Sequence, residues 1–169
     1  TPVQRTATAI GVPAIPTLQR MDSVLRRTAH RLLKDNLPFP LLDLVELTAG
    51  SLRLHLNQPA ELPDPWQADP DRLVWSLPTA EDLPDLGDLP DGQPAPWPLL
   101  VTIGTDGPTT WLANLEQPGI ITLVGDQVFS RDYVRYLAAE LALSPWADGI
   151  TIRCIGTDDI VEQLNPGRF

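Results

Sequence analysis

The residues whose types and spacing come nearest to a chemical motif are "GDQVFSRD", from Gly125 to Asp132. They follow an apolar run, "GIITLVG" at 119–125, and precede an amphipathic pattern. Strand, loop and helix in this order form the junction at which nucleotide-binding proteins hold phosphate, because the helix N-terminus offers free N–H groups and the positive end of its dipole. This loop is therefore the first candidate for an anion site.

The loop departs from the phosphate-binding motif G-x-x-x-x-G-K-[ST] at the positions that carry the chemistry. In that motif the second glycine lets the backbone curl round the phosphates, the lysine neutralises them, and the hydroxyl holds magnesium. Counted from Gly125, these positions hold Ser130, Arg131 and Asp132, and Asp126 adds a second carboxylate. The sequence thus predicts the outline of a nucleotide site without its chemistry. The alternative is a remnant anion site made by Gly125, Ser130 and Arg131.

Other catalytic and metal-binding patterns are missing from the sequence. It contains no G-x-G-x-x-G, G-x-S-x-G or H-E-x-x-H. One cysteine and two histidines at unrelated spacings exclude a zinc cluster. Acidic residues recur every third position in 82–91, but not in the register of a calcium loop. We therefore expect no catalytic residue, no cofactor and no metal site, and we interpret His55 as an exposed strand residue without a carboxylate partner.

The charge balance excludes several classes of partner. The chain of 169 residues carries a net charge of -10, whereas binding to nucleic acid or to anionic membranes needs clustered Lys and Arg. No apolar stretch is long enough to insert into a membrane. The lone cysteine, Cys154, cannot form an internal disulfide and favours a cytoplasmic location. Because the sequence has neither an initiator Met nor the layout of a signal peptide, we expect it to be part of a longer chain.

The periodicity predicts a helix from Leu18 to Asp35 with one basic face. That face is either an ordinary solvated surface, or it docks an acidic partner or the acidic segment of this same chain. The residues that would make such a docking face are Arg20, Arg26, Arg27 and Arg31.

Alternating apolar residues predict a β-hairpin over 42–56, a short strand at 73–77, and a second hairpin starting at 99. Trp66 is expected to anchor the loop between the first hairpin and the short strand. The apolar runs 119–125 and 149–156, with a helix over 130–142 between them, predict a right-handed parallel crossover with Cys154 buried in its second strand. Ser130 would be the N-cap of that helix.

These elements predict an α+β fold with four ranges. Residues 1–17 are a linker or surface strap, and 18–77 form a helix plus β-hairpin lobe. Residues 78–98 are an acidic, proline-rich connector, because they hold five acidic residues, several prolines and no basic residue. Residues 99–169 form a partly parallel α/β lobe with the degenerate P-loop-like element.

Two stretches together resemble a known arrangement. They are the helix from Leu18 followed by "LVELTAGSLRLHLNQPAELPDPWQADPDRLVWSL", and "PLLVTIGTDGPTTWLANLEQPGIITLVGDQVFSRDYVRYLAAELALSPWADGITIRCIG". The pair resembles the central region of large actinobacterial proteins that combine membrane helices, a LysM-like module and a bacterial transcriptional activator domain. The second stretch is also similar to the start of the ATPase modules of type VII secretion and DNA-translocase proteins.

The resemblance implies a bacterial regulatory role beside the membrane. We therefore expect a non-catalytic regulatory or protein-interaction domain of a larger membrane-linked protein, with the remnant nucleotide- or anion-binding module as the alternative. Its partners would be proteins. It would lie in the cytoplasm, tethered to the membrane through segments outside this sequence.

Overall fold

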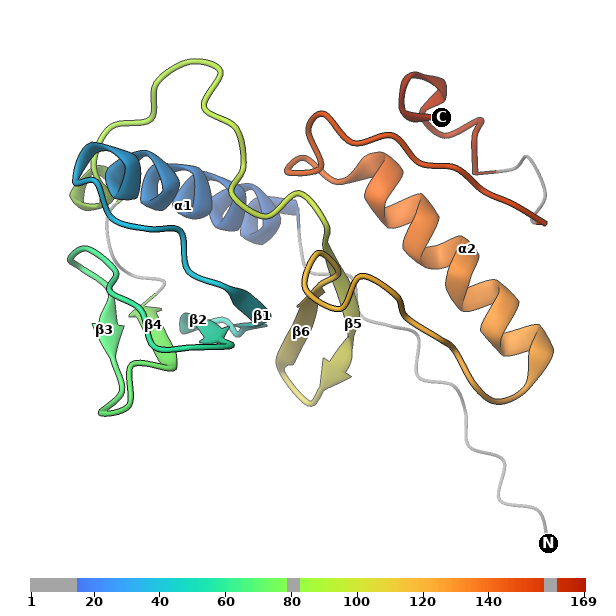
Figure 1. Ribbon diagram of the computed structural model, residues 1–169, viewed down its shortest axis with the longest axis horizontal. Coiled ribbons are helices and arrows are strands. Elements are labelled where there is room, and N and C mark those ends of the chain that lie inside the picture. Colours follow the sequence, from blue (N-terminus) through green and yellow to red (C-terminus); the bar gives the residue numbers. More distant parts are fainter. Residues whose placement is uncertain (1–14, 79–82, 157–160) are drawn as a thin grey trace, which may run out of the picture.

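The computed structural model describes residues 15–78, 83–156 and 161–169 (Figure 1). Its first element is α1, Ile15–Lys34, which confirms the helix predicted from the spacing of apolar residues. Met21, Val24, Leu25 and Leu32 lie on one side of α1 and are buried. The predicted linker, 1–17, lies almost entirely outside the described residues.

A six-stranded antiparallel sheet forms the centre of the fold, in the spatial order β3-β4-β2-β1-β6-β5. The strands are β1 Leu42–Leu47, β2 Ser51–Leu56, β3 Gln67–Ala68, β4 Val74–Pro78, β5 Leu100–Asp106 and β6 Thr109–Asn114. Both predicted hairpins are confirmed, β1 with β2 and β5 with β6. Since β1 also pairs with β6, strands from both sides of the 78–98 range share one sheet.

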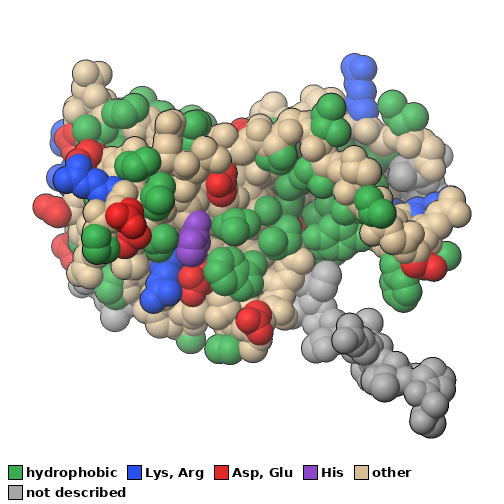
Figure 2. Space-filling model, turned by 60° about the horizontal axis from the view of Figure 1, so that its bottom comes forward, with side chains coloured by type: hydrophobic (Ala, Val, Ile, Leu, Met, Phe, Trp, Pro, Cys, Tyr) green, Lys and Arg blue, Asp and Glu red, His purple; other side chains and the backbone are tan. Residues whose placement is uncertain are grey.

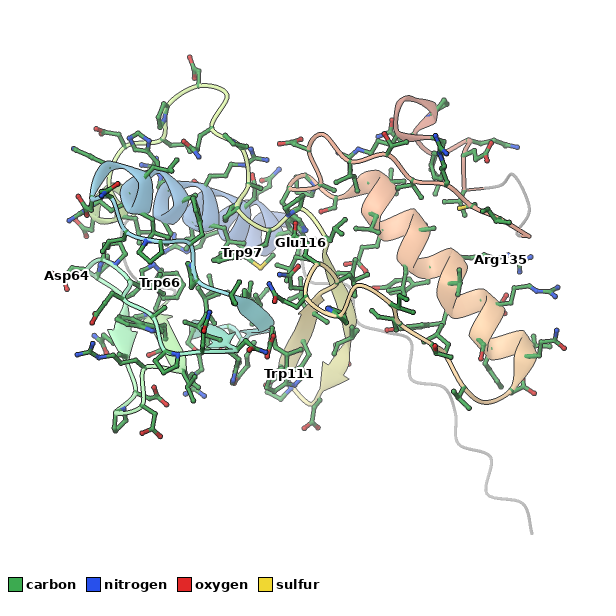
Figure 3. The ribbon with its side chains drawn as sticks, in the orientation of Figure 1. Asp64, Trp66, Trp97, Trp111, Glu116 and Arg135 are labelled. Carbon is green, nitrogen blue, oxygen red and sulfur yellow. The ribbon has the colours of Figure 1, made fainter. Side chains whose placement is uncertain are left out.

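The core lies between one face of this sheet and α1 (Figure 1). Alternation along β2 directs Leu52, Leu54 and Leu56 into it, and each of these side chains is buried. Trp66 and Trp97 lie beneath α1 (Figure 3) and are also buried. The Trp66 indole N–H donates to Thr28 Oγ1 at 3.0 Å, so this residue anchors its loop to α1 as predicted.

The described part of the acidic connector lies along α1. It contains a 3-10 turn, Leu83–Leu86, in which Leu86 is buried. The guanidinium of Arg27 donates to Gly87 O, and that of Arg26 donates to Gln93 O at 2.6 Å. The connector is therefore held to the helix by both apolar burial and hydrogen bonds to arginine.

The second helix, α2 (Gln127–Leu143), covers the open edge of β5. Glu140 Oε1 accepts a hydrogen bond from the backbone N–H of Thr102 at 2.8 Å. The indole N–H of Trp146 donates to Leu100 O at 2.8 Å. Side chains thus satisfy backbone groups that an edge strand leaves unpaired, which protects the edge from pairing with another chain.

The C-terminal residues close over the end of α2. They include a 3-10 turn, η2, Pro166–Arg168. Arg168 donates to Leu141 O and Ser144 O, and Asn165 Nδ2 donates to Ala142 O at 2.8 Å. These contacts satisfy carbonyl groups that every helix leaves unpaired at its C-terminus.

The α+β class is confirmed, but the sheet differs from the prediction because all of its ladders are antiparallel. The ranges predicted as parallel strands, 119–125 and 149–156, contain no strand. A parallel strand is stable when neighbours pair with both of its edges and helices cover both of its faces. No described strand pairs with 119–125 or with 149–156, so both ranges remain irregular.

Candidate functional site

The N-terminus of α2, where a phosphate would bind, is already occupied by a carboxylate of the chain. Asp126 is the N-cap, and its Oδ1 accepts from the backbone N–H of Val128 at 2.9 Å and of Phe129 at 3.1 Å. The predicted N-cap, Ser130, is wrong: it lies inside the helix, where its N–H donates to Asp126 O. Aspartate is among the preferred N-cap residues, and here it takes two of the N–H groups that an anion would need.

The remaining residues of the predicted anion site do not converge on a cavity. Gly125 adopts a φ of 141°, in a region that favours glycine. Arg131 is exposed and lines a shallow hollow with Asp132 and Arg135, and Asp132 Oδ1 accepts from Arg135 Nη1 at 2.9 Å. Arg131 therefore shares its hollow with the carboxylate of Asp132.

The segments that flank α2 present an unusual amount of apolar surface. Ile120 is 86% exposed and Val124 is 91% exposed, although both belong to a run of branched apolar residues. Phe129 and Val124 line an open hollow of about 370 Å³. We call the exposed side chains of this region the C-terminal apolar surface, comprising Ile120, Ile121, Val124, Val128 and Phe129.

Cys154 belongs to the range 149–156, which was predicted to be a buried strand. It is only half-buried, so its predicted burial is wrong. Its neighbour Ile155 is 92% exposed. Burial would have required the parallel strand that does not form. A backbone hydrogen bond from the N–H of Ile152 to Arg168 O, 2.7 Å long, ties this range to the C-terminal residues.

The basic face of α1 is largely engaged within the chain. Arg26 forms ion pairs with Asp22 at 2.8 Å and with Asp148 at 2.7 Å, and it also donates to Pro145 O. Arg31 pairs with Asp35 at 2.9 Å, while Arg27 holds the connector. The sequence left open whether this face is solvated, docks an acidic partner, or docks the acidic segment of the same chain. The contacts of Arg26 and Arg27 with the connector fit the last of these interpretations. Arg20 lies on the same helix.

The outer face of the sheet contains a polar cluster that sequence reasoning missed. Contrary to the prediction, His55 has a carboxylate partner, since its Nε2 lies 3.2 Å from Glu46 Oε2. Arg53 Nη1 reaches the same carboxylate at 3.4 Å, and the His55 ring lies 5.5 Å from that of Trp111. A histidine beside basic and acidic side chains is visible on this face in Figure 2. The hairpin register, which places Glu46 opposite Arg53, could have revealed the cluster.

A cavity of about 280 Å³ lies where α2, β5 and the start of α1 meet. Leu18, Leu143 and Trp146 contribute to its mainly apolar lining, and Tyr136, Glu140 and Ser144 also line it. Burial, followed by the neighbouring Glu140, raises the pKa of the Tyr136 phenol, which stays protonated. This site had no signal in the sequence, because its walls come from three separate elements.

The described residues contain neither a cluster of metal ligands nor a membrane-spanning helix. Within 15–78, 83–156 and 161–169, no three His, Cys, Asp or Glu side chains lie close enough to hold a metal ion. Asp82, the first of the regularly spaced acids, is outside the described residues. No described helix combines the length and the hydropathy needed to cross a membrane.

The comparisons with known proteins add no assignment. The chain matches no protein-family model, no curated protein and no solved structure.

Proposed function

We propose that this chain is a non-catalytic protein-interaction domain of a larger bacterial, membrane-linked regulatory protein. The observation that carries the proposal is the C-terminal apolar surface. Of the thirteen large hydrophobic side chains exposed in the described residues, eight lie between Ile120 and Ile155. Hydrophobic side chains at the surface are visible on the right of Figure 2, where α2 and its flanking segments lie.

Clustered apolar surface of this kind marks an interaction site, whereas single exposed apolar residues are ordinary. The range 119–124 is rich in branched residues, has no strand partner among the described residues, and contains no charged side chain. The partner that fits it is an extended polypeptide strand, because such a strand supplies both backbone hydrogen bonds and apolar side chains. The bacterial and membrane-linked setting of the proposal rests on the resemblance described above.

Site-specific photocrosslinking tests the proposal. A photoreactive phenylalanine analogue at Val124 is expected to crosslink to one discrete polypeptide, or to one discrete segment of the full-length protein, in the cells that produce it. The matched control places the analogue at Leu33, which is 56% exposed on α1 and far in sequence from the surface. Ile120→Lys should abolish the Val124 product, because a charge within an apolar contact must be desolvated.

Two results would overturn the proposal. One is the absence of any discrete product from Val124. The other is the same set of products from Val124 and Leu33, since that pattern reports random encounters rather than a site.

A further inference from the structure

The cavity where α2, β5 and the start of α1 meet leaves apolar surface open to solvent. Leu18 and Leu143 line it, and Leu143 is 61% exposed. Apolar surface gains free energy when another apolar group removes it from water. The volume of about 280 Å³ lies just below the range of small-molecule sites, which is roughly 300 to 1,000 Å³. The cavity therefore suits one or two apolar side chains.

The chemistry of the lining favours an uncharged occupant. Neither Lys nor Arg is among the described residues that line the cavity, so a carboxylate would lose its hydration there without gaining a cation. The carboxylate of Glu140 is used within the chain, because its Oε1 accepts from the backbone N–H of Thr102 at 2.8 Å and its Oε2 is buried. The lining thus selects apolar groups over charged ones.

The chain supplies such groups directly before α1. The structure describes the chain from residue 15, and Leu18, in the first turn of α1, lines the cavity. The range 6–14, "TATAIGVPA", precedes this turn and contains no charged side chain. Its two large apolar residues are Ile10 and Val12. By contrast, the other two ranges outside the described residues, "TAED" and "TDDI", each contain two carboxylates.

The distance along the chain allows these residues to reach the cavity. Residues 15–18 of the helix span about 5 Å, and an extended chain from residue 15 back to Val12 spans about 10 Å. Val12 can therefore reach the cavity that Leu18 lines. A segment tethered this closely also has an effective concentration of about millimolar, which favours it over a free ligand.

We propose that the segment before α1 folds back and fills the cavity with the side chains of Ile10 and Val12. The segment then acts as a strap that joins α1 to α2, and α2 is the helix that covers the edge of β5. This strap does not depend on the proposed interaction function, because the cavity and the C-terminal apolar surface are lined by different residues.

Nuclear Overhauser contacts in the full chain, residues 1–169, test the strap. With the methyl groups of Ile, Leu and Val labelled, Val12 is expected to show contacts to Leu143 and to the ring of Trp146. Val3, a residue of the same type beside Arg5, is the matched control and should show neither contact. The absence of both contacts from Val12, or the same contacts from Val3, would overturn the proposal. So would contacts seen only between differently labelled copies, since a second copy would then be the occupant.

Substitutions in the strap give a second readout. Val12→Asp should remove the contacts and raise amide hydrogen exchange in α2 about tenfold, because a carboxylate would have to be desolvated in the cavity. Val3→Asp adds the same charge to the same segment and should leave exchange unchanged. If Val12→Asp does not fold, Val12→Ala keeps the segment uncharged and should cause a smaller rise. Exchange in α2 that is unchanged by a folded Val12 variant would contradict the strap.

Discussion

The sheet with α1 and the region around α2 bury their apolar side chains to very different degrees. Leu42, Val45 and Leu54 in the sheet are fully buried, whereas Ile120, Val124 and Ile155 are at least 86% exposed. Both regions contain branched apolar runs of the kind that forms strands. The difference is that each described strand has a neighbour, while 119–125 and 149–156 have none. Strand-forming sequence therefore becomes a strand only where pairing and a covering surface are both available.

The largest expected effect contrasts a buried leucine with an exposed isoleucine. Leu112→Ala removes a fully buried side chain of β6 and should lower the free energy of unfolding by about 2 to 5 kcal/mol. Ile120→Ala should change it by less than about 0.5 kcal/mol, because Ile120 is 86% exposed. Urea denaturation of the two variants measures both values. A loss at Ile120 comparable to that at Leu112 would mean that residues 119–125 are packed in solution.

A pair of tryptophan variants tests whether the two regions unfold separately. Trp146→Phe leaves Leu100 O without its donor, and Trp66→Phe removes the bond to Thr28 Oγ1. Each should cost about 1 to 3 kcal/mol, since the partners are buried. Hydrogen exchange is expected to increase in α2 for Trp146→Phe and in α1 for Trp66→Phe. Faster exchange of both helices in both variants would show that the molecule opens as one unit.

The elements of the first region could be predicted from the sequence because each has a local signature. The 3.6-residue period gave α1, and alternation with turn residues gave both hairpins. The anchoring of Trp66 also followed from its position in a proline-rich loop. These features depend on residues close in sequence, or on a single helix and hairpin packing together.

The rest depends on contacts that a single sequence does not display. The pairing of β1 with β6 joins residues about seventy positions apart, and the cavity takes its walls from α1, β5 and α2. The carboxylate partner of His55 depends on hairpin register. The parallel crossover was predicted from apolar runs alone. Such runs indicate that a segment tends to be buried, but they do not show whether a neighbouring strand exists.

A smaller effect is expected from the cap of α2. Asp126→Ala removes the acceptor of the Val128 and Phe129 N–H groups and should cost about 1 kcal/mol, confined to the first turn of the helix. Exchange of those two amides should become faster, while exchange in the sheet stays unchanged. Asp132→Ala is the control, because its carboxylate forms an exposed pair with Arg135. Equal effects of the two variants would show that negative charge near the N-terminus of α2 stabilises the helix, and that the hydrogen bonds of the cap do not.

Arg131→Ala is expected to have the smallest effect, both on the free energy of unfolding and on nucleotide binding. Arg131 is exposed and shares a hollow with Asp132, and Asp126 already holds two of the helix N–H groups. ATP, with or without magnesium, should therefore leave the thermal midpoint of the chain unchanged, whereas a ligand at one hundred times its Kd would contribute about 2.7 kcal/mol. A magnesium-dependent shift that Arg131→Ala removes would instead establish the remnant nucleotide module. If ATP shifts the midpoint only in Asp126→Ala, and Arg131→Ala in that background abolishes the shift, then the cap is what closes the anion site. The region around α2 would in that case retain phosphate-binding geometry that its own aspartate occupies.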